Sequence, residues 1–312
     1  MSSGYDCAMQ IDFKRIDHFL AVIEHRSINA AARALGMTQA GLTKSIRALE
    51  AQIGGDLFAR SPRGVTATRL GETMLRHSRI IENQRLQAIE ALQAQTTGIE
   101  AELRLGISMK WALRLVVPDV LARFSDHPKR PRITVVSGRQ SWQMIRDLRD
   151  GELDMVLATP TEQDDLSGLT PRFFRRDGQR VVVRRGHPLD TGAPVTLRML
   201  AKHPWVRGAP ETYFRRYIEG LFLTEGLTPP APLFTIDSSE LMLDVIARTD
   251  LFGVTTERMM SVQHSDLLTM LDTPAYQERT TALLTRNEDI LPDIADEVIG
   301  EIGRGLDAIQ VR

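Results

Sequence analysis

The chain has 312 residues, of which 42% are hydrophobic and 25% charged, and its formal net charge is −1. That length suits two or three domains, and the composition is that of an ordinary globular protein rather than a disordered or fibrous one. Cys7 is the single cysteine of this sequence, which excludes an internal disulfide and a zinc site built from several cysteines. No apolar run approaches the roughly 18 residues of a membrane span, and the N-terminus lacks a signal-peptide pattern, so we expect a cytoplasmic protein.

The N-terminal segment, residues 12–69, is basic and the remainder is acidic. Within this segment three stretches carry apolar residues at helical spacing, and the second and third are separated by a few residues around Gly36. Ser27 and Thr38 are expected N-caps, and Gly36 and Gly54 expected ends. Two helices so closely joined predict a helix-turn-helix. The three apolar stripes are Ile16, Phe19, Leu20 and Ile23; Ile28, Ala31, Ala32 and Leu35; and Leu42, Ile46, Leu49 and Ile53.

After the third helix, a turn from Pro62 to Gly64 lies between two β-prone pieces and predicts a β-wing. A proline-free stretch from Thr68 to about Thr96 then predicts one long amphipathic helix. Such a helix has little core of its own, so we expect a partner helix from a second copy to cover its apolar side.

From Leu103 onward, strands alternate with helices, which predicts parallel sheet and βαβ units. The expected helices cover residues 113–124, 214–223, 240–246 and 290–309, and a further one follows the strand at 133–136 and ends at Arg149. The expected strands cover residues 103–107, 133–136, 155–158, 180–183, 233–236, 251–255 and 279–284. The fold class is therefore α/β behind an all-α winged helix-turn-helix.

The third helix has a polar outward face near its N-terminus. Short hydrogen-bonding and cationic side chains in this pattern are those that read base edges in the DNA major groove. Arg33, Arg60 and Arg63 are expected to contact phosphates and set the register without reading sequence. We expect Thr38 at the cap to lie at the same surface. The predicted reading residues are Gln39, Ala40, Thr43, Lys44 and Arg47.

Several of these segments resemble LysR-type transcriptional regulators. The resemblance is dense over residues 11–71 and rests on Ser27–Ala32, Leu35–Gln39, Leu42–Glu50, Leu57–Arg60 and Arg63–Thr66. Further along, the Gly-x-Leu-Asp sequence at Gly151–Asp154 resembles an element of the same family. Carried over position by position, the family's DNA contacts fall on Gln39, Ala40, Thr43 and Lys44, which agrees with the face derived above.

The resemblance implies three domains and several partners. The domains are a winged helix-turn-helix over residues 11–69, a linker and dimerisation helix over 70–98, and an effector domain over 99–312. The effector domain would have two lobes like a periplasmic binding protein, lobe I being 99–161 with 273–312 and lobe II 162–272. The implied partners are promoter DNA, a small-molecule effector, RNA polymerase and further copies of the chain in a homodimer or homotetramer.

Ligands of open α/β sheets collect at the carboxyl ends of strands, beside helix N-termini. We therefore expect an effector site built from the loops that follow the strands, and the resemblance implies the same loops, with Ser108 foremost. Lys110 and Arg207 favour an anionic effector such as a carboxylate, although both could be ordinary surface cations. Trp142 could line this site, but we expect it to pack a helix instead. The candidate residues are Ser108, Met109, Lys110, Gln140, Ser141, Thr159 and Thr161 in lobe I, and Arg207, Gly208, Thr212, Asp237 and Ser238 in lobe II.

Two other functions remain open from the residues alone. The α/β part suits a solute-binding module, and an enzyme fused to a DNA-binding domain is the other alternative. The seven histidines are scattered, with no metal-ligand spacing and no adjacent nucleophile. No phosphate loop or dinucleotide fingerprint is present. We therefore expect no catalytic residue, no metal and no cofactor, and a regulator rather than an enzyme.

Overall fold

The computed structural model describes residues 11–61, 64–97, 102–208, 213–262, 264–287 and 291–309. By its internal contacts the chain divides into two compact units, the first of which comprises the chain up to Leu92 and the short segment Arg149–Glu152. The boundary falls inside the long helix that the sequence predicts between the domains. Within the described ranges, no helix is long and apolar enough to cross a membrane.

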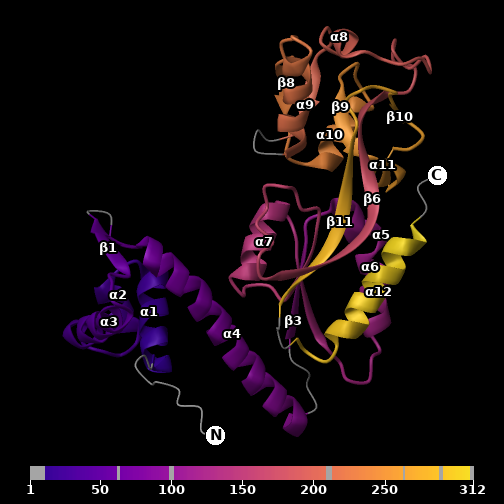
Figure 1. The fold of residues 1–312 in the computed structure, drawn as a ribbon. Helices are drawn as coiled ribbons and strands as arrows, with labels where there is room; N and C mark the ends of the chain where they lie inside the picture. Colours follow the sequence, from indigo (N-terminus) through magenta and orange to yellow (C-terminus); the bar gives the residue numbers. More distant parts are fainter. Residues whose placement is uncertain are drawn as a thin grey trace, which may run out of the picture. The chain divides into compact units, whose positions relative to one another are not determined.

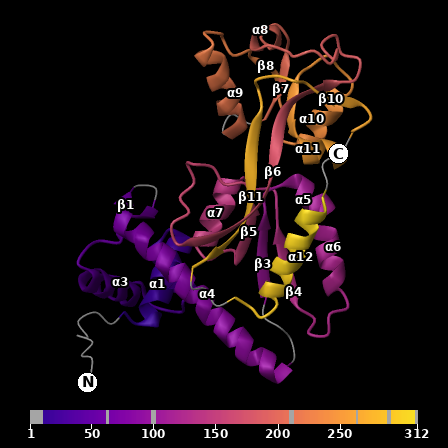
Figure 2. The same cartoon turned by 45° about the vertical axis from the view of Figure 1, so that its right-hand side comes forward.

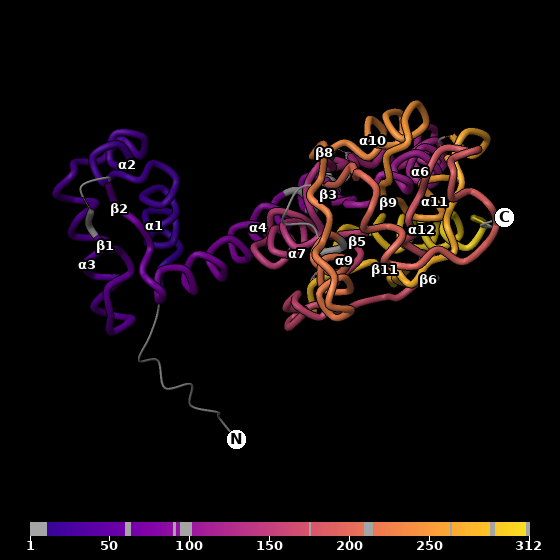
Figure 3. The backbone as a smooth tube through the Cα atoms, turned by 90° about the horizontal axis from the view of Figure 1, so that it is seen from above, coloured from indigo at the N-terminus to yellow at the C-terminus, as the bar shows by residue number. Residues whose placement is uncertain are grey.

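The first unit is a winged helix-turn-helix (Figures 1 and 3). Its two strands pair antiparallel, with Ser61 opposite Gly64 at the turn. The expected helices, strands and linker helix are all present, within a few residues of their expected bounds. Its elements are α1 (Phe13–His25), α2 (Ile28–Ala34), α3 (Gln39–Ile53), β1 (Phe58–Ser61), β2 (Gly64–Ala67) and the start of α4 (Arg69–Thr97).

Local capping explains where α2 and α3 begin and end. The Ser27 hydroxyl accepts a hydrogen bond from the Ala30 amide, and the Thr38 hydroxyl accepts one from the Gly41 amide. These oxygens satisfy amide groups that have no partner inside the helix. At the other end of α3, Gly54 has a φ of 83°, a left-handed conformation that suits glycine.

The core of this unit forms where the three helices meet the wing. Leu42, Ile46 and Leu49 of α3 are buried with Phe19 and other apolar residues, and the Phe19 and Phe58 rings lie 5.2 Å apart. The stripe predicted on α3 is confirmed. On α1, Val22 is fully buried and Leu20 is partly buried, so the inward face is rotated slightly from the predicted one.

Two glycines allow close backbone approaches in this unit. A Cβ on Gly71 would lie 2.1 Å from the Leu57 carbonyl oxygen, because the start of α4 packs directly on the chain entering β1. Gly64 has a φ of 116°, and a Cβ there would lie 2.8 Å from the Arg26 carbonyl oxygen. The wing is also bound at this point, since the Val65 amide donates to the same carbonyl. Glycine is required at both positions because any larger residue would clash.

His18 links α1 to α3 through its Nδ1, which lies 2.7 Å from the Ser45 hydroxyl. Burial lowers the pKa of His18, as does nearby Lys14, while Asp17 and Asp12 oppose the shift. The folded protein therefore binds this proton less readily than the unfolded chain. The contribution of His18 to stability is fully present above the unfolded pKa, about 6.5, and is lost as pH falls through the lower folded value.

We expect His18→Gln to lower the free energy of unfolding by about 1 kcal/mol at pH 7.5, because the Ser45 contact is lost. The difference from wild type should shrink as the pH falls to 5, which denaturant unfolding of the full chain measures. His25→Gln on the same helix removes an exposed imidazole and is the control. A difference that grows toward acid pH would contradict the assignment of a neutral buried histidine.

The second unit is a mixed α/β domain with two lobes (Figures 1 and 2). Its helices are α5 (Lys110–Leu115), α6 (Val117–Phe124), α7 (Ser141–Arg149), α8 (Leu197–Leu200), α9 (Tyr213–Thr224), α10 (Ser239–Ile246), α11 (Glu257–Val262) and α12 (Ala295–Ala308). Its strands are β3 (Glu102–Ile107), β4 (Arg132–Val136), β5 (Met155–Ala158), β6 (Leu169–Arg184), β7 (Trp205–Arg207), β8 (Pro232–Thr235), β9 (Gly253–Thr256), β10 (Leu268–Met270) and β11 (Gln277–Arg286).

The main sheet has the strand order β10-β6-β11-β5-β3-β4, and β9 also pairs with β6. Strand β3 runs parallel to β4 and β5, as expected, but β11 is antiparallel to β5 and β6. The prediction of parallel sheet is therefore wrong for the part of the sheet built by β6 and β11.

Strands β6 and β11 connect the two lobes (Figure 2). Residues 169–173 of β6 pair with the end of β11, which itself pairs with β5, whereas residues 179–184 pair with β9 and β10. The expected strand at 180–183 is thus the last part of a much longer one. The lobe boundaries remain a prediction, and this pairing favours placing them inside β6 and β11 rather than at 162 and 273.

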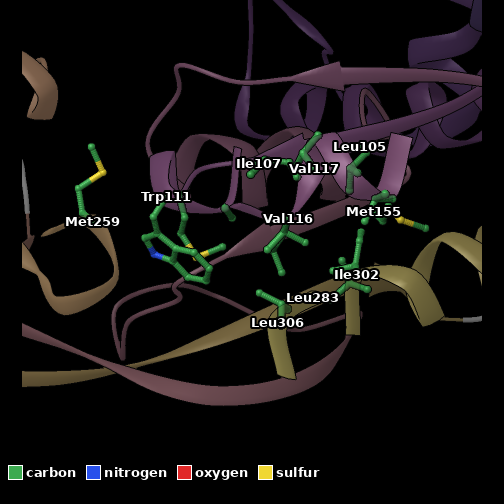
Figure 4. Packing of buried hydrophobic residues seen from close by; sticks show 14 of the residues in the cluster. Leu105, Ile107, Trp111, Val116, Val117, Met155, Met259, Leu283, Ile302 and Leu306 are labelled. Atoms are coloured by element: carbon green, nitrogen blue, oxygen red, sulfur yellow. The ribbon is translucent and has the colours of Figure 1, made fainter. Parts of the chain in front are cut away.

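Lobe I buries apolar residues on both faces of its sheet. Figure 4 shows Leu105, Ile107 and Met155 of the strands gathered with Ile302 and Leu306 of α12. The other face packs against Met144, Ile145 and Leu148 of α7. The expected helix 113–124 is two helices, since Pro118 falls in the first turn of α6 and has no amide to continue α5.

Asp154 joins three neighbouring strands of lobe I. Its carboxylate accepts from the Arg104 amide at 2.8 Å and from Arg104 Nη2 at 2.8 Å. Arg286, at the end of β11, places its Nη2 3.6 Å from Asp154 Oδ1. The same guanidinium also donates to the Leu148 carbonyl. The Gly-x-Leu-Asp element therefore places a fully buried carboxylate between β3, β5 and β11.

Candidate nucleic-acid interface and effector cavity

The outward face of α3 carries the residues predicted to read DNA. Gln39, Ala40, Lys44 and Arg47 are exposed, while Leu42, Ile46 and Leu49 are buried on the opposite side. Thr38 is exposed too; its hydroxyl accepts from the Gly41 amide, and its proton remains available to donate. The helix N-terminus adds partial positive charge to this face, which suits contact with DNA phosphates.

Thr43 differs from the expectation. It is half-buried, and its hydroxyl oxygen is buried without a hydrogen-bond partner among the described residues. The hydroxyl therefore points into the unit, which leaves the methyl group as the part that faces outward. A methyl group suits apolar contact with a thymine methyl rather than hydrogen bonding to a base.

Of the predicted phosphate contacts, Arg33 is exposed in the last turn of α2. The side chain of Arg60 and the whole of Arg63 lie outside the described residues. The wing itself is held to α3 by Glu50, whose Oε1 accepts from the Leu57 amide at 2.9 Å and the Phe58 amide at 3.4 Å. Glu50 thus sets where the wing begins relative to the reading helix.

A cavity of about 780 Å³ lies between the lobes of the second unit. That volume is within the usual range for a small-molecule site. Its lobe I wall is formed by the ends of β3 and β5 and the starts of α5 and α7, as the strand-end rule predicts. The lobe I candidates that line it are Ser108, Met109, Lys110, Gln140, Ser141, Thr159 and Thr161.

Hydrogen bonds organise this wall. The Ser108 and Ser141 hydroxyl oxygens lie 3.0 Å apart, and the Thr159 amide donates to Ser141 at 3.4 Å. Thr161 closes a turn through Asp164, whose Oδ2 accepts from the Thr161 amide and hydroxyl. Three loops that are distant in sequence therefore meet at one polar patch.

On the lobe II wall, Arg207, Gly208 and Asp237 line the cavity, and Thr212 lies outside the described residues. Ser238 does not line it. Its hydroxyl instead accepts from the Leu241 amide as the N-cap of α10 and donates to Glu240 at 3.0 Å. The neighbouring Ser239 occupies the lining position.

The expectation that Trp142 packs a helix is wrong. Its ring is about half exposed, lines the cavity, and lies 5.8 Å from the Arg146 guanidinium. The indole sits at the start of α7, where the helix N-terminus faces the cavity, and it is not part of the buried apolar face of that helix.

The sequence reasoning missed the residues that the connecting strands supply. Asp177 and Gln179 of β6, Thr256 of β9 and Arg279 of β11 all line the cavity. Arg279 donates to the Thr159 carbonyl and so reaches from β11 to the end of β5. Asp177 and Gln179 lie in the charged segment 172–180. Its sequence lacks the alternation typical of a strand and contains Gly178, yet it pairs with β11 along most of its length.

Comparison with known proteins identifies the family. Residues 13–72 match the family described as bacterial regulatory helix-turn-helix protein, lysR family, and residues 96–306 match the LysR substrate binding domain. The chain belongs to the LysR family. The resemblance predicted from the sequence and the fold class are both confirmed.

Individual proteins agree with this assignment. The chain is 29% identical to the transcriptional regulator GbpR of Azospirillum brasilense over 77% of its own length and 70% of that protein. It is 31% identical to the uncharacterised regulator YnfL of Escherichia coli over 71% and 74%. The fold also matches CbnR, solved in complex with its target DNA, with a TM-score of 0.59 at 17% identity over 95% and 100% of the two chains.

The chain is thus a LysR-type DNA-binding transcriptional regulator with a helix-turn-helix unit and an effector-binding domain. The proteins that it resembles are named as transcriptional regulators. No cluster of His, Cys, Asp and Glu that could hold a metal occurs in the part of the chain that the structure describes.

Proposed function

We propose that this LysR-type regulator binds a small anion in the cavity of its effector domain, and that the anion controls DNA binding or promoter activation. The observation that supports this proposal is the buried and incompletely paired guanidinium of Arg207. Arg207 is 6% exposed, and it lines the cavity. Its Nε and Nη2 are buried without a hydrogen-bond partner among the described residues.

The charge around Arg207 is incompletely balanced. Its Nη1 donates to Glu219 Oε1 at 2.9 Å, and Arg215 Nε donates to the same oxygen at 3.0 Å. Two guanidinium groups therefore share one carboxylate. Burial lowers the pKa of Arg207, and Glu219 opposes that shift. An anionic ligand would satisfy the unpaired donors, each of which costs about 1–3 kcal/mol when left buried without a partner.

Lys110 has a different part in this proposal. Its Nζ lies 3.3 Å from Glu240 Oε2 and 3.5 Å from the Asp237 carbonyl oxygen. Burial alone would raise the pKa of Glu240. Hydrogen bonds from its own amide and from Ser238, together with Lys110, outweigh burial and lower the pKa of Glu240. Lys110 is therefore already paired across the cavity, from α5 to α10, and we assign the anion to Arg207 instead.

The other assignments of this proposal concern partners and location. Gln39, Lys44 and Arg47 read bases, and Arg33 contacts phosphate. Large apolar side chains exposed on α4, such as Leu86 and Leu92, pack against a second copy in a homodimer or homotetramer. RNA polymerase is a further partner, the protein works in the cytoplasm where the DNA is, and it is not an enzyme.

Calorimetric titration of the full chain with small carboxylates tests the anion site. We expect Arg207→Gln to weaken carboxylate binding at least tenfold, since a charged hydrogen bond contributes about 1.5–3 kcal/mol. Arg198→Gln removes an exposed arginine of α8, outside the cavity lining, and should leave binding unchanged. Equal affinity in wild type and Arg207→Gln would show that the anion is not held there.

An operator selected from random duplexes then allows the regulatory step to be tested. Footprints with and without the bound carboxylate should differ in extent or strength, with protected half-sites about 34 Å apart or a multiple of that distance. A footprint that the carboxylate leaves unchanged, together with unchanged transcription from the same DNA in vitro, would contradict regulation through this cavity.

A further inference from the structure

Asp177 lines the cavity and carries a carboxylate oxygen without a hydrogen-bond partner among the described residues. Its side chain is 6% exposed and lines the cavity wall where β6 passes between the lobes. Oδ1 accepts a 3.4 Å hydrogen bond from the Arg258 amide, whereas Oδ2 is buried with no partner among the described residues. A buried carboxylate oxygen without a donor is costly, so a ligand that brings a donor gains from contacting it.

Gln179 adds a second acceptor two residues along the same strand. Its Oε1 is likewise buried without a partner among the residues described, and its side chain lines the cavity. Residues two apart on a strand point to the same side. Asp177 and Gln179 therefore form one acceptor patch on β6.

This patch has the opposite hydrogen-bonding character to Arg207. Arg207 offers two unpaired donors, while Asp177 and Gln179 offer two unpaired acceptors. A ligand that satisfies all of them needs an anionic group at Arg207 and hydroxyl or amine donors elsewhere on the molecule. A simple fatty or aromatic monocarboxylate would leave the acceptor patch unpaired.

The surrounding charges favour hydroxyl groups over an ammonium group. Burial raises the pKa of Asp177, while Arg258 opposes that shift through its charge and its backbone amide. Arg258 is itself buried and places its guanidinium 4.9 Å from the centre of the Trp111 ring. Arg258 therefore already balances the charge of Asp177, so the patch has no net negative charge to hold an ammonium, whereas a neutral hydroxyl donor does not need one.

We propose that the effector is a small carboxylate that carries several hydroxyl groups, with its carboxylate at Arg207 and hydroxyls donating to Asp177 and Gln179. The assignment rests on the proposed anion site and adds the chemistry of the rest of the ligand. Apolar walls from Trp205, Met242 and Met259 suit the C–H faces of such a carbon chain.

Calorimetric titration of the full chain with matched probes tests this proposal. The hydroxylated probes are the six-carbon acids gluconate, galactonate and mannonate. The comparison probes are hexanoate, which lacks hydroxyls, glucitol, which lacks the carboxylate, and norleucine, which carries an ammonium. We expect at least one hydroxylated acid to bind ten times more tightly than hexanoate, and also more tightly than glucitol or norleucine.

Two variants connect that preference to the acceptor patch. Asp177→Asn removes the charge and Gln179→Met removes the amide oxygen at similar size. Each should weaken binding of the preferred hydroxylated acid about tenfold and change hexanoate binding less than twofold. Asp266→Asn, an exposed change outside the cavity lining, should alter neither affinity.

The outcomes separate this proposal from the anion site. If hexanoate binds as tightly as every hydroxylated acid, or if neither patch variant changes the preference, the hydroxyl assignment is wrong while the anion site stands. If norleucine is preferred, the donor is an ammonium and the hydroxyl assignment is again wrong. If no carboxylate binds at all, both proposals fail.

Discussion

Replacing Asp154 with alanine should lower the free energy of unfolding of the second unit, called the effector unit below, by about 3–5 kcal/mol. This is the loss typical of breaking a buried ion pair. The carboxylate is fully buried and lies 2.8 Å from Arg104 Nη2 and 3.6 Å from Arg286 Nη2. Without it, Arg286, which is 7% exposed, and Arg104, whose side chain is 24% exposed, lose this carboxylate. The cost therefore comes mainly from the buried charge of Arg286.

Urea unfolding of the full chain, followed by the fluorescence of its tryptophans, measures this effect. The three tryptophans, Trp111, Trp142 and Trp205, all lie in the effector unit, so the signal reports on that unit. Asp126→Ala removes an exposed carboxylate of the same lobe and should change stability by less than about 0.5 kcal/mol. A loss below about 1 kcal/mol for Asp154→Ala would mean that the network contributes little.

The second large effect is expected at the reading face of α3. The double variant Gln39→Ala with Lys44→Ala should weaken binding to the selected operator by about 2–4 kcal/mol, or about 30- to 1,000-fold, since each base contact contributes about 1–3 kcal/mol. Both side chains are exposed, so their removal should leave the fold intact. Binding to random duplex should fall much less, because phosphate contacts remain.

Titrations of both duplexes at fixed salt distinguish base reading from simple charge attraction. Lys202→Ala removes one exposed positive charge from the effector unit and should not change the preference for the operator. If the double variant loses the same factor on operator and random duplex, Gln39 and Lys44 contact the backbone and other residues read the sequence.

In the first unit, local sequence was enough to predict the helices and the reading face. The spacing of Leu42, Ile46 and Leu49 marks the inward stripe of α3, and Thr38 and Gly54 mark its ends. These features act within one or two helical turns, so they are visible without knowing the rest of the fold. The orientation of the Thr43 hydroxyl is different, because it depends on what packs against that helix.

In the second unit, the strand-end rule predicted that Ser108, Ser141 and Thr159 lie together. The structure shows hydrogen bonds between Ser108 and Ser141 and between Thr159 and Ser141. The rule works because parallel strands end at one edge of a sheet. It does not apply to antiparallel strands that run between lobes, so Asp177 and Gln179 were missed. A charged run such as 172–180 does not predict a strand, and long-range pairing with β11 makes it one.

The sequence by itself therefore determined the class of the protein and the helix that reads DNA, because apolar spacing, capping residues and family motifs are local signals. The tertiary structure alone decided how the effector cavity is charged. It pairs Lys110 with Glu240 and leaves Arg207, Asp177 and Gln179, which line the cavity, with buried polar atoms that have no partner among the described residues. Such pairing depends on distances between residues far apart in the chain, which only the packed lobes establish.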